Sequence, residues 1–243
     1  MIYICTHTDF EESHIGENYT IAATHPLEKK YQNKVLVADN DWKDLQFAYS
    51  EGYVFRVIYE KTKDDWVGIC HYRKYFEGEI REELTLPMPM IFNMHQQYAS
   101  CHNINDLLDC EKIIDKYYPQ YHTDYAAIDR LFACNMFVMK REDFEKYYEF
   151  VFGVLEKFKE EKGLHTDNDV MEYVKKNVDC YGVKLNVDLH SQQQHNDRYD
   201  LLYQSRLLGF LQERLGTIFF LTYFKDKKIT YKKVAVGEKI YCY

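Results

Sequence analysis

Short apolar runs of strand length alternate with a segment of helical periodicity along the first third of the chain. Residues 2–6, 19–23 and 34–38 are such runs, and a further run that starts at residue 66 ends at His71. Residues 45–61 carry apolar side chains at helical spacing around a single glycine. This order of strands and helices predicts an α/β fold with a mixed, largely parallel sheet flanked by helices.

The later part of the chain has a mainly helical pattern. Residues 104–118, and the segment after the apolar run 131–139, have apolar side chains three or four positions apart, which is typical of helices packed on a core. We expect a C-terminal helical segment from residue 199 onwards. The length of 243 residues fits a single domain over 1–243.

Composition narrows the class of protein. A net charge of -8, with 39 acidic against 31 basic residues, argues against a general nucleic-acid binder, because such proteins need a basic excess. The seven cysteines include no CxxC pair, so they predict neither a disulfide framework nor a zinc ribbon. The first residues lack the pattern of a signal peptide, and no stretch has the roughly 18 apolar residues of a membrane span. We therefore expect a cytoplasmic protein.

The segment WVGICHYRKYF joins an apolar strand to a cluster of polar and cationic side chains. The strand is followed directly by His71, Tyr72, Arg73 and Lys74. In open α/β sheets ligands bind at the carboxyl ends of the strands. Histidine, arginine and lysine suit an anionic ligand there, such as a nucleoside diphosphate. The alternative is a strand whose polar end simply meets solvent.

Two polar features later in the chain are further candidates. The stretch IFNMHQQYASCHN can either line a sugar site or form a polar surface loop, because it is dense in hydrogen-bonding side chains: Asn93, His95, Gln96, Gln97, Tyr98 and His102. Asn135 interrupts an apolar strand, so it is either a structural hydrogen-bonding group or a ligand contact.

The C-terminal region offers a polar face on an otherwise apolar helix. Arg206 and Glu213 are seven residues apart and therefore share that face, either for a ligand or as an ion pair that fixes the helix. Gly209 lies between them and allows close approach of a neighbour or a ligand. The apolar run 217–224 is followed by lysines and either packs in the core or rests on an anionic membrane surface.

Two Asp-x-Asp triplets could hold a divalent cation through their carboxylate oxygens. Asp39 and Asp41 follow a strand and are the better metal candidates. Asp167 and Asp169 precede a helix, where capping explains them without catalysis. Asp169 is also a candidate for the base that would deprotonate an acceptor hydroxyl.

With these motifs the sequence resembles the bacterial capsule and exopolysaccharide glycosyltransferases that carry the domain of unknown function numbered 4422. Residues 67–76 match the pattern VGxCHYRRYF, with Lys74 in place of the second arginine. Other parts of the pattern are matched by Ser50 and Glu51, by Asn93 and His95, by residues 135–137 (Asn-Met-Phe) and by residues 206–214 (R-x-x-G-F-L-x-E-R).

The resemblance implies a GT-A-like fold and a hexosyltransferase that moves a sugar from a nucleotide-sugar donor, such as a UDP-sugar, to a glycan or lipid-linked acceptor. Some members are thought to transfer galactofuranose. Residues 1–76 would form the nucleotide-binding half, residues 77–198 the acceptor-side half and residues 199–243 a C-terminal extension. Residues 52–54 (Gly-Tyr-Val) stand where the family has Leu-Thr-Ala, which leaves the donor preference open.

The chemistry of the residues and the resemblance together suggest roles for individual residues. The expected donor-binding residues are Thr6, His7, Ser50, Glu51, His71, Arg73, Asn135, Arg206, Glu213 and Arg214. The expected acceptor-binding residues are Asn93, His95 and Tyr98, and the catalytic candidates are His71 and Asp169. GT-A enzymes commonly carry an Asp-x-Asp metal motif where this chain has His-Tyr-Arg, so cationic side chains could replace a metal. We leave the need for manganese or magnesium open.

Two other classes of function fit part of the pattern. A phosphotransferase or nucleotidyltransferase would also place histidine, arginine and lysine around a diphosphate, but the chain has no glycine-rich phosphate loop. A non-catalytic carbohydrate-binding subunit of a polysaccharide assembly complex would use tyrosine and asparagine surfaces without a diphosphate site. Binding of free UDP separates this class from the transferase, which we expect to work at the inner face of the membrane, in peripheral contact with it.

Overall fold

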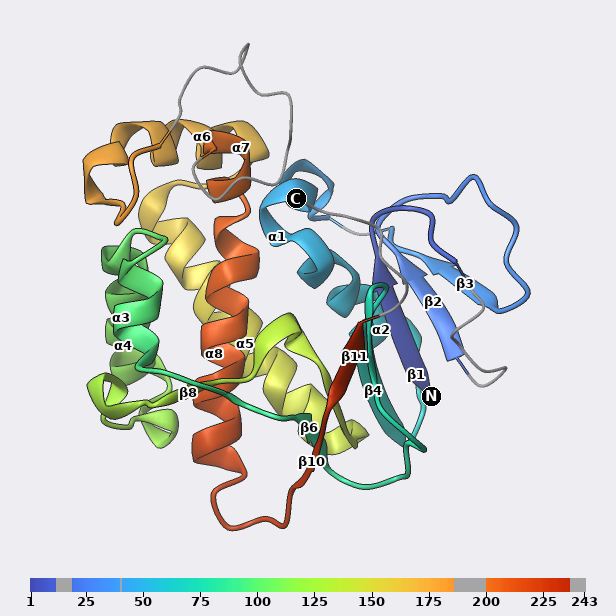
Figure 1. Cartoon of the computed structure of the whole chain (residues 1–243). Coiled ribbons are helices and arrows are strands. Elements are labelled where there is room, and N and C mark those ends of the chain that lie inside the picture. The colour runs from blue at the N-terminus through green and yellow to red at the C-terminus, as the bar shows by residue number, and fades with distance from the viewer. Residues whose placement is uncertain (12–18, 40, 186–199, 237–243) are drawn as a thin grey trace.

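The computed structural model describes residues 1–11, 19–39, 41–185 and 200–236. Nine of the described strands form one mixed sheet, in which β10, β6, β9, β4, β1, β2 and β3 lie side by side in that order, and β5 pairs with both β4 and β11 (Figure 1). The predicted α/β fold with helices flanking a mixed sheet is confirmed.

The strands are β1 (Ile2–Thr6), β2 (Tyr19–Ala23), β3 (Lys34–Val37), β4 (Trp66–His71), β5 (Lys74–Phe76), β6 (Thr85–Pro87), β7 (Met90–Ile91), β8 (Arg130–Leu131), β9 (Phe137–Lys140), β10 (Thr230–Lys232) and β11 (Val234–Val236). The α-helices are α1 (Gln46–Tyr49), α2 (Phe55–Lys61), α3 (Met94–Ala99), α4 (Ile104–Tyr117), α5 (Arg141–Lys162), α6 (Asp167–Lys176), α7 (Leu201–Gln204) and α8 (Leu207–Tyr223). Short 3₁₀ turns are η2 (Lys43–Leu45), η3 (Ser50–Val54), η4 (Pro119–Tyr121), η5 (Tyr125–Ala127), η6 (Ala133–Asn135) and η7 (Val178–Cys180).

One edge of the sheet collects the polar strand ends. Strands β4, β1, β2 and β3 are parallel neighbours, so their carboxyl ends share this edge. Strand β9 runs antiparallel to β4, with Phe137 opposite Ile69, and its first residues therefore meet the last residues of β4. The ends of five strands thus converge where the sequence predicted a ligand site.

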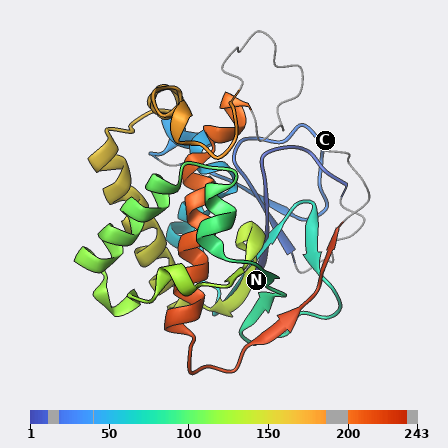
Figure 2. The same cartoon turned by 60° about the vertical axis from the view of Figure 1, so that its left-hand side comes forward.

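The long helices α4, α5 and α8 lie together on one side of the sheet, as both views show (Figures 1 and 2). The apolar positions that predicted α5 are buried against the sheet and α8; they include Phe144, Tyr147, Val151, Leu155 and Phe158. The helix ends at Gly163, which adopts the left-handed conformation that commonly closes a helix (φ 67°). Helix α8 is buried on most sides, and this large core holds it against the rest of the molecule.

Two predicted elements differ from the structure. The single helix expected over residues 45–61 is divided into α1, η3 and α2, because the backbone turns at Ser50, whose φ is 53°. The strand expected over residues 131–139 is divided by η6, where Cys134 and Asn135 also have positive φ. In both places the apolar pattern continues through the turn, so periodicity alone did not reveal the break.

The expected C-terminal helical segment is only partly helical. Helices α7 and α8 are followed by two strands that join the sheet, β10 beside β6 and β11 beside β5. Within the described ranges, no helix is long and apolar enough to cross a membrane.

Candidate functional site

A cavity of about 520 Å³ opens at the edge where β4 ends, β9 begins and α8 starts. Its lining includes eight of the ten expected donor-binding residues: Ser50, Glu51, His71, Arg73, Asn135, Arg206, Glu213 and Arg214. These residues come from η3, the end of β4 and the turn after it, η6, and the N-cap and first turns of α8. The fold thus brings together side chains that lie up to about 160 residues apart in the sequence.

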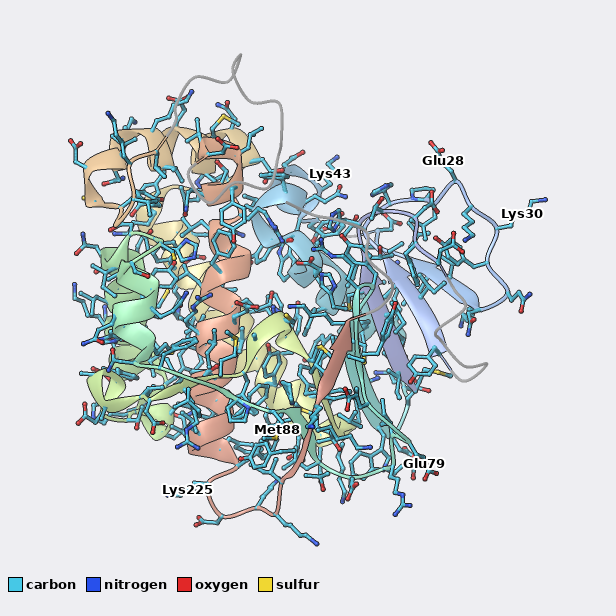
Figure 3. The ribbon with its side chains drawn as sticks, viewed as in Figure 1. Glu28, Lys30, Lys43, Glu79, Met88 and Lys225 are labelled. Atoms are coloured by element: carbon cyan, nitrogen blue, oxygen red, sulfur yellow. The ribbon has the colours of Figure 1, made fainter. Side chains whose placement is uncertain are left out.

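A second cavity of about 470 Å³ adjoins the first and shares Ser50 and Arg206 with it. Its lining includes His7 after β1 and Thr24 and His25 after β2. The remaining lining residues are Lys43, Gln46, Phe47 and Asp167. Lys43 projects at the rim near α1 (Figure 3). The two cavities together follow the carboxyl ends of β2, β1 and β4 along the sheet edge.

Glu51 and His71 form the centre of a hydrogen-bonded group in the wall of the main cavity. The backbone N–H of Arg73 donates to Nδ1 of His71 at 3.0 Å, so the ring proton lies on Nε2. Nε2 lies 2.9 Å from Oε1 of Glu51 and donates to it. His71 is therefore held in one orientation and one tautomer, with its proton directed at a carboxylate.

The second oxygen of Glu51 is held from the opposite side. Ser50 Oγ donates to Glu51 Oε2 at 2.6 Å, and a guanidinium nitrogen of Arg206 lies 2.6 Å from Ser50 Oγ and 3.4 Å from Glu51 Oε2. Burial opposes the charge of Glu51, but the hydrogen bond from His71 and the charge of Arg206 hold its pKa well below the usual range. Glu51 is thus an ionised carboxylate in the cavity wall.

Arg73 and Lys74 supply positive charge with no carboxylate partner. Among the described residues, no Asp or Glu oxygen lies within 4 Å of either cationic group. The Arg73 guanidinium stacks on the ring of Tyr72 at 4.8 Å, and Lys74 Nζ donates to Cys134 Sγ at 2.9 Å. Two uncompensated cations beside a cavity favour an anionic ligand.

Glu213 and Arg214 connect α8 to the turn before β9. Glu213 Oε1 accepts from the backbone N–H of Cys134 at 2.6 Å, and Glu213 Oε2 accepts from Arg214 at 3.0 Å. Arg214 also donates to Oε1 of Gln97 at 2.7 Å. This chain of hydrogen bonds fixes the conformation of η6, where Asn135 faces the cavity.

Backbone strain is concentrated at the same cavity. Ser50, Cys134 and Asn135 are the three non-glycine residues in the described part of the chain with positive φ, and all three line it. Such conformations cost about 1–3 kcal/mol each and persist where the surroundings enforce them, often at ligand sites.

Two buried polar atoms near the cavity are also unsatisfied. Oδ1 of Asn135 and Nε of Arg214 have no hydrogen-bond partner among the residues that the structure describes. An orphaned buried polar group is costly unless a ligand or water pairs with it. The strained backbone therefore supports a ligand role for this cavity, whereas the two unpaired atoms are enclosed within its wall.

Several predicted site residues lie elsewhere. Thr6 is buried at the end of β1, where its hydroxyl bonds to the backbone of Thr8. Asn93 caps α3, because its side chain accepts from the N–H of Gln96. His95 pairs with Glu111 at 2.6 Å. None of these lines either cavity, and neither does Tyr98, which is fully buried.

Of the four acidic candidates, none lines the main cavity and only Asp167 lines the second one. Asp169 completes a capping box with Thr166 at the start of α6, as the capping interpretation predicted, and lines neither cavity. Asp41 pairs with Arg56 at 3.1 Å on an exposed surface, and Asp39 is exposed. In the described ranges, no group of three or more His, Cys, Asp or Glu side chains has an arrangement that could hold a metal ion.

The main cavity also contains residues that the sequence analysis did not assign. Gln97 and His102 belong to the polar stretch that was predicted as a sugar site or a surface loop, but they were not among the residues expected to bind the acceptor. Tyr203 and Phe210 add aromatic surface from α7 and α8. The helical phase of α3 separates Gln97, which lines the cavity, from Tyr98, which is buried, while the side chain of Asn93 is used to cap the helix.

Comparisons with known proteins agree with this picture at the level of the fold. Residues 81–175 match the family described as "Domain of unknown function (DUF4422)". No curated protein matches the chain. The structure is similar to one described as "WbbM bifunctional glycosytransferase apo structure", with a TM-score of 0.67 and 15% sequence identity. That alignment covers 98% of this chain and 45% of the other, so this chain spans less than half of that protein's length. The chain thus has an α/β, GT-A-like fold, and its central part matches the family of unknown function DUF4422.

Proposed function

We propose that the protein is a glycosyltransferase that moves a hexose from a nucleotide-sugar donor to a glycan or lipid-linked acceptor. The observation that carries the proposal is the cavity at the carboxyl edge of the parallel strands, where Arg73 and Lys74 offer uncompensated positive charge beside the ionised Glu51. The similarity in fold to a glycosyltransferase and the DUF4422 match support it.

Transfer of a sugar develops negative charge at one position and positive charge at another, so the site needs both cationic and anionic side chains. Departure of a nucleoside diphosphate develops negative charge on a phosphate oxygen, which Arg73, Lys74 and Arg206 would stabilise. The anomeric carbon becomes positive, and Glu51 and Glu213 are the carboxylates that line the cavity. We assign stabilisation of that carbon to these two residues, and Asp169 to the cap of α6.

The second cavity would receive the nucleoside. It shares Ser50 and Arg206 with the main cavity, so a diphosphate beside these two residues would connect the two spaces. The rings of His25 and Phe47 offer surfaces on which a base could stack. We propose UDP as the nucleotide and UDP-galactofuranose as the first donor to test.

In the cell, we propose a role in capsule, exopolysaccharide or lipopolysaccharide synthesis at the inner face of the membrane. The cationic side chains would take the place of a metal at the diphosphate, in line with the uncompensated charge of Arg73 and Lys74. Manganese would then be dispensable for binding of UDP.

Calorimetric titration with UDP, with and without manganese, tests the proposal. We expect Arg73→Ala to weaken UDP binding at least tenfold, because a charge-assisted hydrogen bond contributes about 1.5–3 kcal/mol. Arg81→Ala is the matched control, since Arg81 is exposed, pairs with Glu79 and lines neither cavity. The absence of UDP binding to the unmodified protein in both conditions would contradict the proposal and favour a non-catalytic carbohydrate-binding subunit.

Transfer itself provides a second test. His71→Ala and Arg73→Ala should abolish transfer of sugar from UDP-galactofuranose while the thermal unfolding curve keeps its cooperative shape. Activity retained in both variants would show that the reaction takes place elsewhere.

A further inference from the structure

One part of the main cavity has no role in the proposed diphosphate site. It is formed by uncharged side chains after β7, between α3 and α4, and around the α7–α8 junction, namely Phe92, His102, Tyr203 and Phe210. The ring of His102 packs between Tyr98 and Phe210, with centroids 4.7 and 4.3 Å away. Tyr203 follows at 5.0 Å from Phe210.

The hydrogen bonds around His102 determine its tautomer. Gln204 donates through its amide nitrogen to the carbonyl oxygen of Cys101 at 2.9 Å, which fixes the orientation of the amide. Its oxygen, Oε1, therefore faces Nδ1 of His102, at 2.8 Å, and can only accept. Nδ1 of His102 must carry the proton, and Nε2 has a free lone pair.

The ring also stays neutral. Burial and the nearby charge of Arg214 lower the pKa of His102 to about 3. The residue is only 5% exposed, and it lines the cavity. Nε2 has no hydrogen-bond partner among the described residues. It is also absent from the unpaired polar atoms that these residues enclose completely, so it keeps some accessible surface. This nitrogen therefore opens to the cavity.

From this geometry we propose that Nε2 of His102 accepts a hydrogen bond from a hydroxyl group of the sugar acceptor, with Phe210 and Tyr203 against the apolar face of that sugar. A neutral lone pair accepts from a hydroxyl and repels a phosphate or carboxylate, so it selects an uncharged sugar ring. Aromatic rings next to such an acceptor suit the C–H face of a sugar. Gln204 is then a positioning residue, because it holds the imidazole in the accepting tautomer.

This inference rests on the proposed function for one point only, namely that the bound sugar is the acceptor in the transfer reaction. The tautomer and the binding of a hydroxyl are properties of the protein alone. Their test can therefore fail or succeed independently of UDP binding.

The first experiment is ¹⁵N NMR of the full chain labelled at histidine. We expect the His102 ring to show a protonated Nδ1 and an unprotonated Nε2 throughout the range from about pH 5.5 to 8. Methyl β-galactofuranoside and methyl β-galactopyranoside are the probes, and binding should shift the Nε2 resonance towards its hydrogen-bonded position. Protonation at Nε2, or an Nε2 resonance that neither glycoside moves, would overturn the proposal.

Kinetics of the variant His102→Phe provide the second experiment. Phenylalanine keeps the stack between Tyr98 and Phe210 but removes the accepting nitrogen. With UDP-galactofuranose as donor and octyl β-galactoside as acceptor, we expect the acceptor KM to rise about tenfold, which corresponds to the loss of one buried hydrogen bond. The affinity for UDP should stay within twofold of that of the unmodified protein. General unfolding would weaken the binding of UDP as well as that of the acceptor. An unchanged acceptor KM would overturn the proposal, whereas failure of the unmodified protein to bind UDP would overturn the proposed function alone.

Discussion

Asp106 is a fully buried carboxyl group in the first turn of α4. Its Oδ1 accepts from Tyr173 at 2.6 Å and from Asn103 at 3.2 Å, while Oδ2 has no partner among the described residues. Burial raises the pKa of Asp106 to about 7, against the opposing hydrogen bond from Tyr173. In the folded protein this residue therefore holds a proton that the unfolded chain releases near pH 4.

We expect this proton to make stability depend on pH. Since the pKa is raised on folding, stability should fall as pH rises from about 4 to about 7, by on the order of 2–4 kcal/mol. Asp106→Asn keeps an accepting oxygen for Tyr173 and should remove most of that dependence. Urea midpoints at several pH values measure it.

Asp109→Asn is the control, because the carboxylate of Asp109 should make stability change with pH in the opposite direction. Although partial burial opposes its charge, hydrogen bonds from Lys112 and Lys162 lower the pKa of Asp109, so its carboxylate stabilises the fold above about pH 4. The substitution should reduce stability at neutral pH. An Asp106→Asn variant with the same pH dependence as the unmodified protein would contradict the assignment of the proton.

The strained backbone at Cys134 leads to a second prediction at this scale. Its φ of 68° lies in the left-handed region, which glycine adopts freely and β-branched residues disfavour. Cys134→Val should therefore be less stable than Cys134→Gly, by about 1–2 kcal/mol, as measured by urea unfolding. Equal stabilities of the two variants would indicate that this turn is not strained.

Residues that line the main cavity were predictable where they follow an apolar strand or occur in a recognised pattern. His71 and Arg73 at the end of β4 are examples, and Arg206 and Glu213 were found from their spacing on a helix. Asn93 shows the limit, because a polar residue in a helix-capping position has the same local pattern as one in a ligand site. Only the three-dimensional position of α3 separates the two roles.

At the scale of elements, the approach of α8 to η3 depends on Gly209. A Cβ atom at this position would lie 3.1 Å from the carbonyl oxygen of Tyr49 and 3.3 Å from Cβ of Ser50. Both contacts are tighter than ordinary van der Waals distances, and one is to backbone. Gly209 therefore lets Arg206 reach Ser50 and Glu51 from the first turn of α8.

We expect Gly209→Ala to displace α8 from η3 and to weaken UDP binding about tenfold, although alanine normally favours a helix by up to about 1 kcal/mol. Gly216→Ala on the same helix is the control. Its Cβ would meet the Tyr147 hydroxyl at 3.2 Å, and Gly216 lines neither cavity. Calorimetry should show UDP affinity lost in the first variant and kept in the second, and equal affinities would exclude this role for Gly209.

Elements with a regular apolar pattern were predicted well, as α4, α5 and the parallel strands show. The breaks within the predicted elements were not predicted. Ser50 and Cys134 adopt conformations that non-glycine residues rarely prefer, and tertiary contacts enforce them. Local sequence carries no signal for a conformation that distant residues impose, so the turns that build the cavity were the least predictable part of the fold.

At the scale of the whole molecule, the β4–β5 turn that carries Arg73 depends on the C-terminal strands. Strand β5 is paired with β4 through a single residue pair, His71 with Lys74. It is paired with β11 through three, of which Val236 with Lys74 is one. The position of the uncompensated cations is thus set largely by residues from the far end of the described chain.

Replacement of residues 230–236 by a Gly-Ser linker of equal length should therefore abolish UDP binding. The large core around α5 and α8 would remain, so we expect the helical circular dichroism signal to persist with a lower Tm. A linker variant that binds UDP as well as the unmodified protein would show that β11 is not required to position Arg73.

The pairing of β5 with β11 also has a consequence for the order in which the protein matures. During synthesis the segment with Arg73 and Lys74 leaves the ribosome long before residues 234–236 do. The parallel strands and the first helices can assemble on the nascent chain, but β5 lacks its principal partner until these last strands emerge. Binding competence should therefore arise late, in a step distinct from formation of the core, so that a partly synthesised chain would not sequester nucleotide.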